Sequence, residues 1–272
     1  MRPVSTRAGP PYAVGSGFHL ADIDPGDTGK LHKGEAAVET EVLRGQLDKL
    51  QERLYAEHEQ SLLLVLQAID TAGKDGTINH VLSGVNPQGC QVTSFKVPTP
   101  EERDHDVLWR YHRATPAKGM IGIFNRSHYE EVLVVCVHEL VPEKVWRPRY
   151  EAIKAFETEL ATGGTTLVKV FLHISRDQQR RRLESRLADP DKRWKFSVAD
   201  LAERERWDAY QSAFDEALRR CSTADAPWWV VPADHKWARN RAVLGVLVDT
   251  LETMDPRFPM PAADLDRVVV PR

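Results

Sequence analysis

The sequence predicts an α/β fold, a three-layer α/β/α sandwich in which helices cover both faces of a parallel sheet. Two observations support this prediction. Continuous apolar runs such as "LLLVL" at 62–66 and "LVKVFLHI" at 167–174 are typical of strands that are buried on both faces. Stretches with helical spacing separate these runs along the chain, as the crossover connections of a parallel sheet require.

Length and charge limit the class of protein. At 272 residues the chain can bury one substantial core, so we expect one domain. No apolar run approaches the roughly 20 residues that cross a bilayer, and the N-terminus shows no signal peptide. We therefore expect a cytoplasmic protein with no membrane partner. The net charge of −3 argues against nucleic acid as a partner, so a polyanion site must be a local concentration of positive charge.

The first elements follow from periodicity. Residues 1–34 mix Pro, Gly and polar residues without a period, which predicts an irregular N-terminal arm or a disordered start. The folded domain is expected at 35–259, and a C-terminal tail at 260–272. The domain begins with an amphipathic helix at 35–58, where leucines recur at three- and four-residue spacing: Leu43, Leu47, Leu50 and Leu54.

Strand and helix signals alternate after this helix. Apolar runs such as "CQVTSFKV", "MIGIF" and "WWVVPA" are interleaved with helical stretches such as "TINHVLSGV" and "ARNRAVLGVLVDTLETM". In parallel sheets, ligands bind beyond the carboxyl ends of the strands. The turns after Ile69 and Phe124 both lie at that edge, so we expect the functional site there.

The turn after the first strand, "AIDTAGKDGT" at 68–77, has the character of a phosphate-binding loop. In such a loop, backbone N–H groups and a helix N-terminus point at phosphates, glycines let the backbone approach, and a lysine adds charge. The stretch departs from G-x-x-x-x-G-K-[ST] at Ala68, which replaces the first glycine, and at Asp75, which replaces the magnesium-binding hydroxyl. The predicted phosphate-binding residues are Ala72, Gly73, Lys74, Asp75, Gly76 and Thr77.

Asp70 is a carboxylate inside a loop that would bind anions. Beside phosphates it costs free energy unless a metal ion or a lysine neutralises it. Its presence therefore predicts a magnesium ligand that bridges two phosphate groups. The alternative is that Asp70 caps the helix of an ordinary strand-to-helix turn.

The second strand end, "MIGIFNRSHYEEVL", carries Asn125 where enzymes of phosphoryl transfer usually place a magnesium-binding Asp. Asn125 can ligate or form hydrogen bonds but brings no charge. Glu130 or Glu131, one turn into the next helix, would restore that charge. Arg126 is placed to neutralise a transferring phosphoryl group, and a surface arginine is the alternative.

The third feature is a basic stretch at 175–205 that predicts a helical lid. Between Arg176 and Lys195 there are eight Lys or Arg and four Asp or Glu, in a chain that is negative overall. Ser175 and Gln178 match a capping box, Leu183 and Leu187 predict one apolar face, and Asp189-Pro190 ends the helix. The alternative is a solvated charged helix. The lid residues expected to bind phosphates are Arg176, Arg182, Arg186 and Lys195.

Weaker candidates lie nearby. Lys96 ends the strand "QVTSFK", and Arg110 and Arg113 lie in "LWRYHRATP", so all three are expected to face the same crevice. Trp194 is expected either to stack on a nucleotide base or to pack in the core.

Four ordered motifs, "AIDTAGKDGT", "FKVPTPEE", "LWRYHRATPAKGMIGIFNRSHYEEVLV" and "DPDKRWKFS", together resemble the polyphosphate kinase 2 family. The resemblance covers about Glu35 to Pro259. It implies a phosphate-binding-loop kinase, related in fold to thymidylate kinase, that uses Mg²⁺ to move phosphoryl groups between inorganic polyphosphate and nucleotides. "FNRSHYEE", with Asn125, resembles the subgroup that acts on both AMP and ADP.

The resemblance also implies roles for particular residues. Lys74 and the loop N–H groups would hold phosphates at the transfer point, Asp70 with Glu130 or Asn125 would hold Mg²⁺ or alternatively Mn²⁺, and Arg126 would offset charge in the transition state. The implied partners are polyphosphate, adenine or guanine nucleotides, and further copies of the chain in a homo-oligomer. The residues assigned to polyphosphate are Lys96, Arg113 and the lid cations, and those assigned to the nucleotide are Arg110, Arg126 and Trp194.

Two other functions stay open at this point. One is an ordinary nucleotide kinase with ATP as donor, against which the missing first glycine and Asp70 both count. The other is a non-catalytic module that senses nucleotides or polyphosphate, which the uncharged Asn125 keeps open.

Overall fold

The computed structural model describes residues 10–261, 265, 268 and 270. Its centre is a six-stranded sheet with the order β1-β6-β5-β2-β4-β3, in which every pairing except that of β1 with β6 is parallel. The strands are β1 (Tyr12–Ala13), β2 (Ser61–Gln67), β3 (Cys90–Ser94), β4 (Ile121–Asn125), β5 (Thr165–His173) and β6 (Trp228–Pro232).

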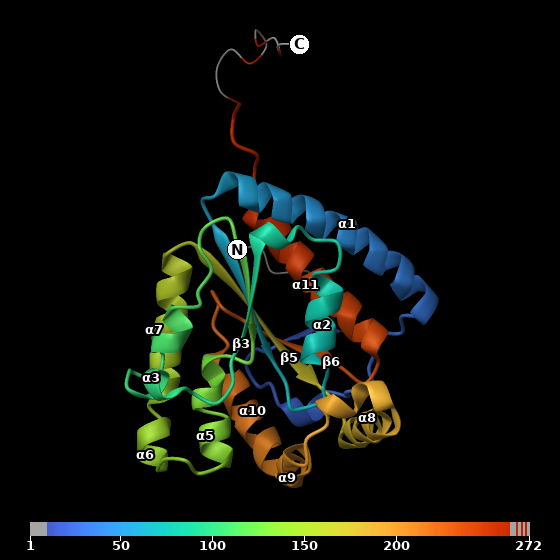
Figure 1. The fold of residues 1–272 in the computed structure, drawn as a ribbon, viewed down its shortest axis with the longest axis vertical. Coiled ribbons are helices and arrows are strands. Elements are labelled where there is room, and N and C mark those ends of the chain that lie inside the picture. The colour runs from blue at the N-terminus through green and yellow to red at the C-terminus, as the bar shows by residue number, and fades with distance from the viewer. Residues whose placement is uncertain (1–9, 262–264, 266–267, 269, 271–272) are drawn as a thin grey trace.

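Helices cover both faces of this sheet. Figure 1 shows α1, α2 and α11 on one side and α7 and α10 on the other, which confirms the predicted three-layer sandwich. The longer helices are α1 (Lys33–Glu57), α2 (Lys74–Val81), α7 (Arg149–Thr162), α8 (Arg176–Ala188), α9 (Ala199–Glu205), α10 (Trp207–Cys221) and α11 (Lys236–Met254). Single turns form α3 (Pro100–Arg103), α4 (Trp109–His112), α5 (Val134–Val137), α6 (Glu143–Trp146) and the 3-10 segments η1 (Leu20–Asp22), η2 (Pro87–Gly89), η3 (His128–Glu131) and η4 (Pro190–Lys195).

The apolar runs of the sequence form the centre of the sheet. All seven residues of β2 are buried, because this strand lies between β4 and β5 and under helices on each face. The long N-terminal helix also forms as predicted: Leu47, Leu50 and Leu54 are buried in the core, and Leu43 packs against it. None of the helices in the described residues has the length and apolar character needed to span a membrane.

The N-terminal segment departs from the predicted disordered start. Tyr12 and Ala13 pair antiparallel with β6, and Val14 and Leu20 are buried in the core. The backbone N–H of Leu20 donates to the Asp215 carboxylate of α10, 2.8 Å away. This segment adds an edge strand through backbone pairing, which needs no periodic side-chain pattern and so leaves no signal in the sequence. Residues 1–9 and most of the predicted tail at 260–272 lie outside the described residues.

The predicted lid is formed by α8, η4 and α9. Ser175 caps α8 by accepting a hydrogen bond from the Gln178 N–H, and the helix ends before Asp189, as predicted. The predicted apolar face is wrong in its second half, because Leu183 is buried whereas Leu187 is 45% exposed. The C-terminal turn of α8 therefore extends beyond the core.

Candidate active site

A cavity of about 1160 Å³ lies at the carboxyl edge of the parallel strands. The loop after β2 and the first turns of α2 line it, together with the ends of β3 and β4. Side chains from α8, η4 and the first turn of α11 complete the lining. The functional site is therefore where the strand ends predict it.

The loop is shaped to expose backbone N–H groups. Gly73 is the N-cap of α2 and has a φ of 108°, a left-handed conformation that favours glycine. The first-turn N–H groups of α2, those of Lys74, Asp75 and Gly76, have no acceptor within the helix and are available to an anion. Thr77 lies beneath the loop instead, because its buried hydroxyl donates to the Gly73 carbonyl at 3.1 Å.

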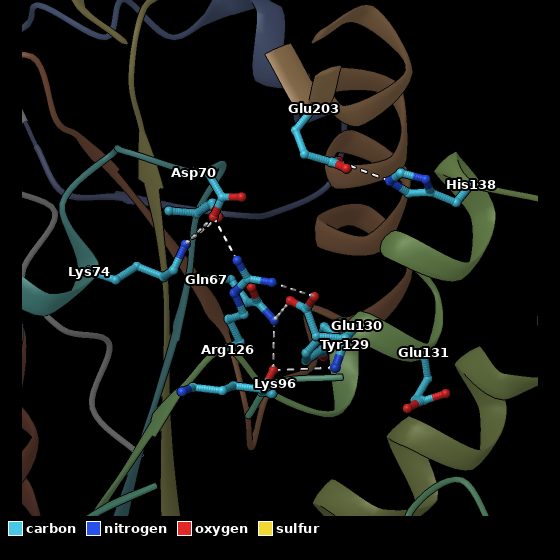
Figure 2. Close-up of polar contacts among 12 residues, drawn as sticks. Gln67, Asp70, Lys74, Lys96, Arg126, Tyr129, Glu130, Glu131, His138 and Glu203 are labelled. Carbon is cyan, nitrogen blue, oxygen red and sulfur yellow. Dashed lines mark hydrogen bonds and ion pairs between the residues drawn. The ribbon is translucent and has the colours of Figure 1, made fainter. Parts of the chain in front are cut away.

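Three charged side chains that line the cavity lie close together (Figure 2). Asp70 Oδ1 lies 2.8 Å from Arg126 Nη2 and 3.7 Å from Lys74 Nζ. Burial alone would raise the pKa of Asp70, but Lys74 and Arg126 outweigh it and hold that pKa below its ordinary value. Asp70 is thus an ionised carboxylate, and it does not act as the N-cap of α2, which is Gly73.

Lys74 folds back across the loop. Its Nζ donates to the Ala68 carbonyl at 2.8 Å. Burial lowers the pKa of Lys74, and Asp70 opposes that shift. A phosphate group near the loop would supply the negative charge that this buried ammonium otherwise obtains from Asp70.

Asn125 ends β4 beside the loop. Its amide Nδ2 donates to Asp75 Oδ1 at 2.8 Å. The uncharged side chain of Asn125 therefore holds the Asp75 carboxylate, in the first turn of α2, by a hydrogen bond. Both side chains line the cavity, as does Lys96 at the end of the neighbouring strand. Asn125, Asp75 and Lys96 therefore stand where the sequence places them.

The two glutamates of η3 have different surroundings. Glu131 is buried and accepts hydrogen bonds from Tyr111 and Arg149, away from the cavity. Glu130 accepts a hydrogen bond from Gln67 at 3.1 Å and lies 3.7 Å from Arg126 Nη1 (Figure 2). The structure places Glu130 behind the guanidinium and outside the lining of the main cavity, where it orients Arg126.

The residues at the loop fit a magnesium ion that shares its coordination with phosphates. Mg²⁺ prefers oxygen ligands and is usually held by one or two carboxylates together with phosphate oxygens and waters. Asp70 supplies an ionised carboxylate at the cavity, and Asn125 supplies an amide oxygen at the next strand end. Within the described part of the chain, no cluster of three or more His, Cys, Asp or Glu side chains forms a metal cage, so substrate oxygens would complete the shell.

The lid residues are only partly as predicted. Arg182, Arg186 and Lys195 line the cavity. Arg182 Nη1 donates to the carbonyls of Thr71 and Ala72, at 3.3 and 2.6 Å, so it holds the loop as well as facing the cavity. Arg176 is exposed and absent from the lining, because the first turn of α8 directs it outward.

Two further predictions are corrected, and one alternative for a third residue is excluded. Arg110 is buried, and its guanidinium binds the Lys96 carbonyl and Tyr111 and lies 3.5 Å from Glu131, so it stabilises the core below the cavity. Arg113 is 65% exposed in its side chain and lies over the Trp109 ring, outside the cavity lining. Trp194 is 77% exposed and also outside that lining, which excludes the core-packing alternative.

Sequence reasoning missed several cations that line the cavity: Arg181, Lys192, Lys236 and Arg239. The last two belong to the first turn of α11, directly after β6. A helix that follows the carboxyl end of a parallel strand points its N-terminus at the ligand edge. That rule, applied to "WWVVPADHKWAR", would have identified Lys236 and Arg239.

A parallel α/β sheet, a phosphate-binding loop and a cation-lined cavity together define a phosphotransferase of the phosphate-binding-loop class. Residues 30–259 match the model of a family described as Polyphosphate kinase 2 (PPK2). The chain belongs to this polyphosphate kinase 2 family, which confirms the resemblance carried by its four motifs.

Individual relatives support this membership. The chain is 51% identical over 255 residues to the AMP/ADP-polyphosphate phosphotransferase of Meiothermus ruber, a match that covers 93% of this chain and 96% of that protein. It is 45% identical to the ADP-polyphosphate phosphotransferase of Rhodopseudomonas palustris, over 93% of this chain and 91% of that one. The crystal structure of Polyphosphate Kinase 2 from Arthrobacter aurescens TC1 superposes with a TM-score of 0.92 at 46% identity, and the match covers 94% of this chain and 92% of that chain.

Proposed function

We propose that this chain transfers phosphoryl groups from inorganic polyphosphate to nucleotides, converting ADP to ATP and AMP to ADP, with Mg²⁺ as cofactor. The observation that carries this proposal is the cluster of Asp70, Lys74 and Arg126 in the lining of a cavity that lid cations also line. The names of the relatives in Meiothermus ruber and Rhodopseudomonas palustris support polyphosphate as donor and AMP and ADP as acceptors.

Positioning and charge compensation supply the rate in this mechanism. The loop N–H groups and Lys74 bind the phosphate at the transfer point. Arg126, which Glu130 orients, offsets the negative charge of the phosphoryl group in the transition state. Asp70 and Asn125 would hold a Mg²⁺ ion, which would supply positive charge against the charge that develops on the phosphates. No covalent enzyme intermediate is required, because the acceptor phosphate can attack directly.

The donor side of the cavity suits an extended polyanion. The lid supplies the cavity with a strip of cations: Arg182 and Arg186, which contact the loop at Ala72 and Thr71, and Lys195. Polyphosphate carries about one negative charge per phosphate. Its binding to such a strip is favoured because its counterions are released. The same strip would give a single nucleotide less benefit, since a nucleotide carries fewer phosphates.

The test is to incubate the purified protein with Mg²⁺ and polyphosphate, add AMP or ADP in separate reactions, and resolve the nucleotides by chromatography. Formation of ADP from AMP and of ATP from ADP is expected. Phosphorylation that requires ATP as donor would indicate an ordinary nucleotide kinase instead. Binding of polyphosphate and nucleotide without turnover in any reaction would indicate a sensing module.

Three finer points belong to the same proposal. We expect adenine nucleotides as acceptors, with guanine nucleotides compared in parallel reactions. We expect a homo-oligomer, which light scattering after size-exclusion chromatography measures. We expect a cytoplasmic location, which cell fractionation tests.

A further inference from the structure

Arg239, in the first turn of α11, lies against the phosphate-binding loop. It is 3% exposed, and its Nη1 donates to the Ala72 carbonyl at 3.1 Å. A Cβ atom at position 73 would lie 2.1 Å from this nitrogen, so Gly73 is also what permits the guanidinium to approach the loop. Arg239 therefore contacts the loop from the first turn of α11.

Among the described residues, no carboxylate pairs with the charge of this guanidinium. Its Nε and Nη2 both donate to the side-chain oxygen of Asn240, a neutral group, and no described carboxylate lies within 4 Å of it. Three of its five N–H groups are thus used, which leaves two for a ligand. Burial, and secondly Arg182, lower the pKa of Arg239 to about 10, so the group remains charged near neutral pH.

The surroundings add positive charge rather than offset it. Arg182 donates to the same Ala72 carbonyl at 2.6 Å, which brings two guanidiniums to one atom. Burial lowers the pKa of Lys236, one turn earlier in α11, and nearby cations that include Arg182 and Arg239 lower it further. Asp234 offsets part of the charge of Arg182. Buried like charges that are not fully compensated still cost free energy, and an anion in the cavity recovers that cost.

We propose that Arg239 is a polyphosphate-binding residue, a fixed cation of the cavity wall that faces the lid cation Arg182. This inference rests on the proposed function, because it assigns the anion to the polyphosphate donor. The donor chain passes between two walls: α8 supplies the cations of the lid, and the first turn of α11 supplies cations anchored in the core. Arg239 is held in place before the ligand arrives, so its binding needs little ordering.

The experiment compares Arg239→Gln with Arg241→Gln. Arg241 is the matched control because it belongs to the same helix but pairs with Glu39 of α1 and does not line the cavity. Each variant is assayed for the KM of polyphosphate and of ADP, for the salt dependence of polyphosphate binding, and for Tm without ligand. Polyphosphate binding is also measured without nucleotide, by fluorescence anisotropy of a labelled chain.

For Arg239→Gln we expect a rise of about tenfold or more in the KM of polyphosphate, an ADP KM within about twofold, and a salt slope reduced by about one. Its Tm without ligand should be unchanged or higher, because an uncompensated buried charge is removed. Arg241→Gln should leave both KM values unchanged. A lower Tm with both KM values raised equally would make Arg239 a structural clamp of the loop, and unchanged polyphosphate affinity would likewise overturn the inference.

The binding measurement separates this inference from the proposed function. If the wild-type protein binds polyphosphate but transfers nothing, the proposed function fails while the loss of binding in Arg239→Gln still supports the residue's role. If the wild-type protein does not bind polyphosphate at all, both fail.

Discussion

Replacement of Asp70 by Asn removes a negative charge that lies between two cations while keeping the shape of the side chain. The carboxylate contacts Arg126 Nη2 at 2.8 Å and Lys74 Nζ at 3.7 Å, and its side chain is 29% exposed. A hydrogen bond to a charged group contributes about 1.5–3 kcal/mol, and partial exposure favours the lower end. Since about 1 kcal/mol shifts the Tm of a chain of this size by about 2–4 °C, Asp70→Asn should lower Tm by about 3–6 °C and remain folded at 25 °C.

The effect on turnover should be far larger than the effect on stability. Loss of one preorganised charged group at a transfer site typically lowers kcat by about 10²–10³. Initial rates with polyphosphate and ADP, measured across a magnesium titration, should show this loss together with a higher magnesium requirement. Asp48→Asn, an exposed aspartate of α1, is the control for removal of charge alone. Wild-type turnover and magnesium dependence in Asp70→Asn would refute the assignment of Asp70 as a metal ligand.

Other substitutions test separate parts of the structure. Arg186→Ala should reduce the salt dependence of polyphosphate binding, measured by anisotropy at several salt concentrations. An unchanged slope of affinity against salt concentration would support the alternative that α8 is a solvated surface helix. Asn125→Asp should lower Tm without Mg²⁺, because it replaces the amide that donates to Asp75 at 2.8 Å by a second carboxylate, and Mg²⁺ should restore the Tm. Glu157→Gln should lower stability by about 3–5 kcal/mol in denaturant unfolding, because it leaves Lys169, whose Nζ lies 2.6 Å away, as an unpaired buried charge.

The Glu157 substitution also has a consequence for pH. Burial alone would raise the pKa of Glu157, but Lys169 and His128 hold it below its ordinary value. A carboxylate with a lowered pKa contributes stability that is fully present above the unfolded pKa of about 4.3 and is lost as the pH falls through the folded pKa. The stability difference between wild type and Glu157→Gln should therefore shrink below about pH 4, and a constant difference down to pH 3 would contradict this origin.

The loop was predictable because its signal is contiguous. A buried strand, a turn with Gly73 and Lys74, and the start of a helix occupy one short stretch, so the sequence alone locates the phosphate site. Asn125 was predictable for a related reason, since parallel strands bring their carboxyl ends to one edge wherever they lie in the chain.

The errors concern which way a side chain points. Arg110 and Arg113 share one short basic motif, yet one is buried with Glu131 and the other lies over Trp109 in solvent. Residue type reports the charge of a side chain but not the partner that it finds in the fold. In the same way, Arg176 opens the basic helix but faces outward, and only residues later in α8 line the cavity.

Two of the cations that were missed, Lys236 and Arg239, follow a rule that a sequence can express. Lys74 opens α2 after β2, and Lys236 opens α11 after β6, so each follows the carboxyl end of a parallel strand and reaches the same cavity. The two positions are far apart in the chain, and no local motif joins them. The carboxyl ends of parallel strands all lie at the same edge of the sheet. Basic residues in the first turns of the helices that follow these strands are therefore concentrated at that edge. A chain with a net charge of −3 can thereby build a site for a polyanion without a basic surface overall.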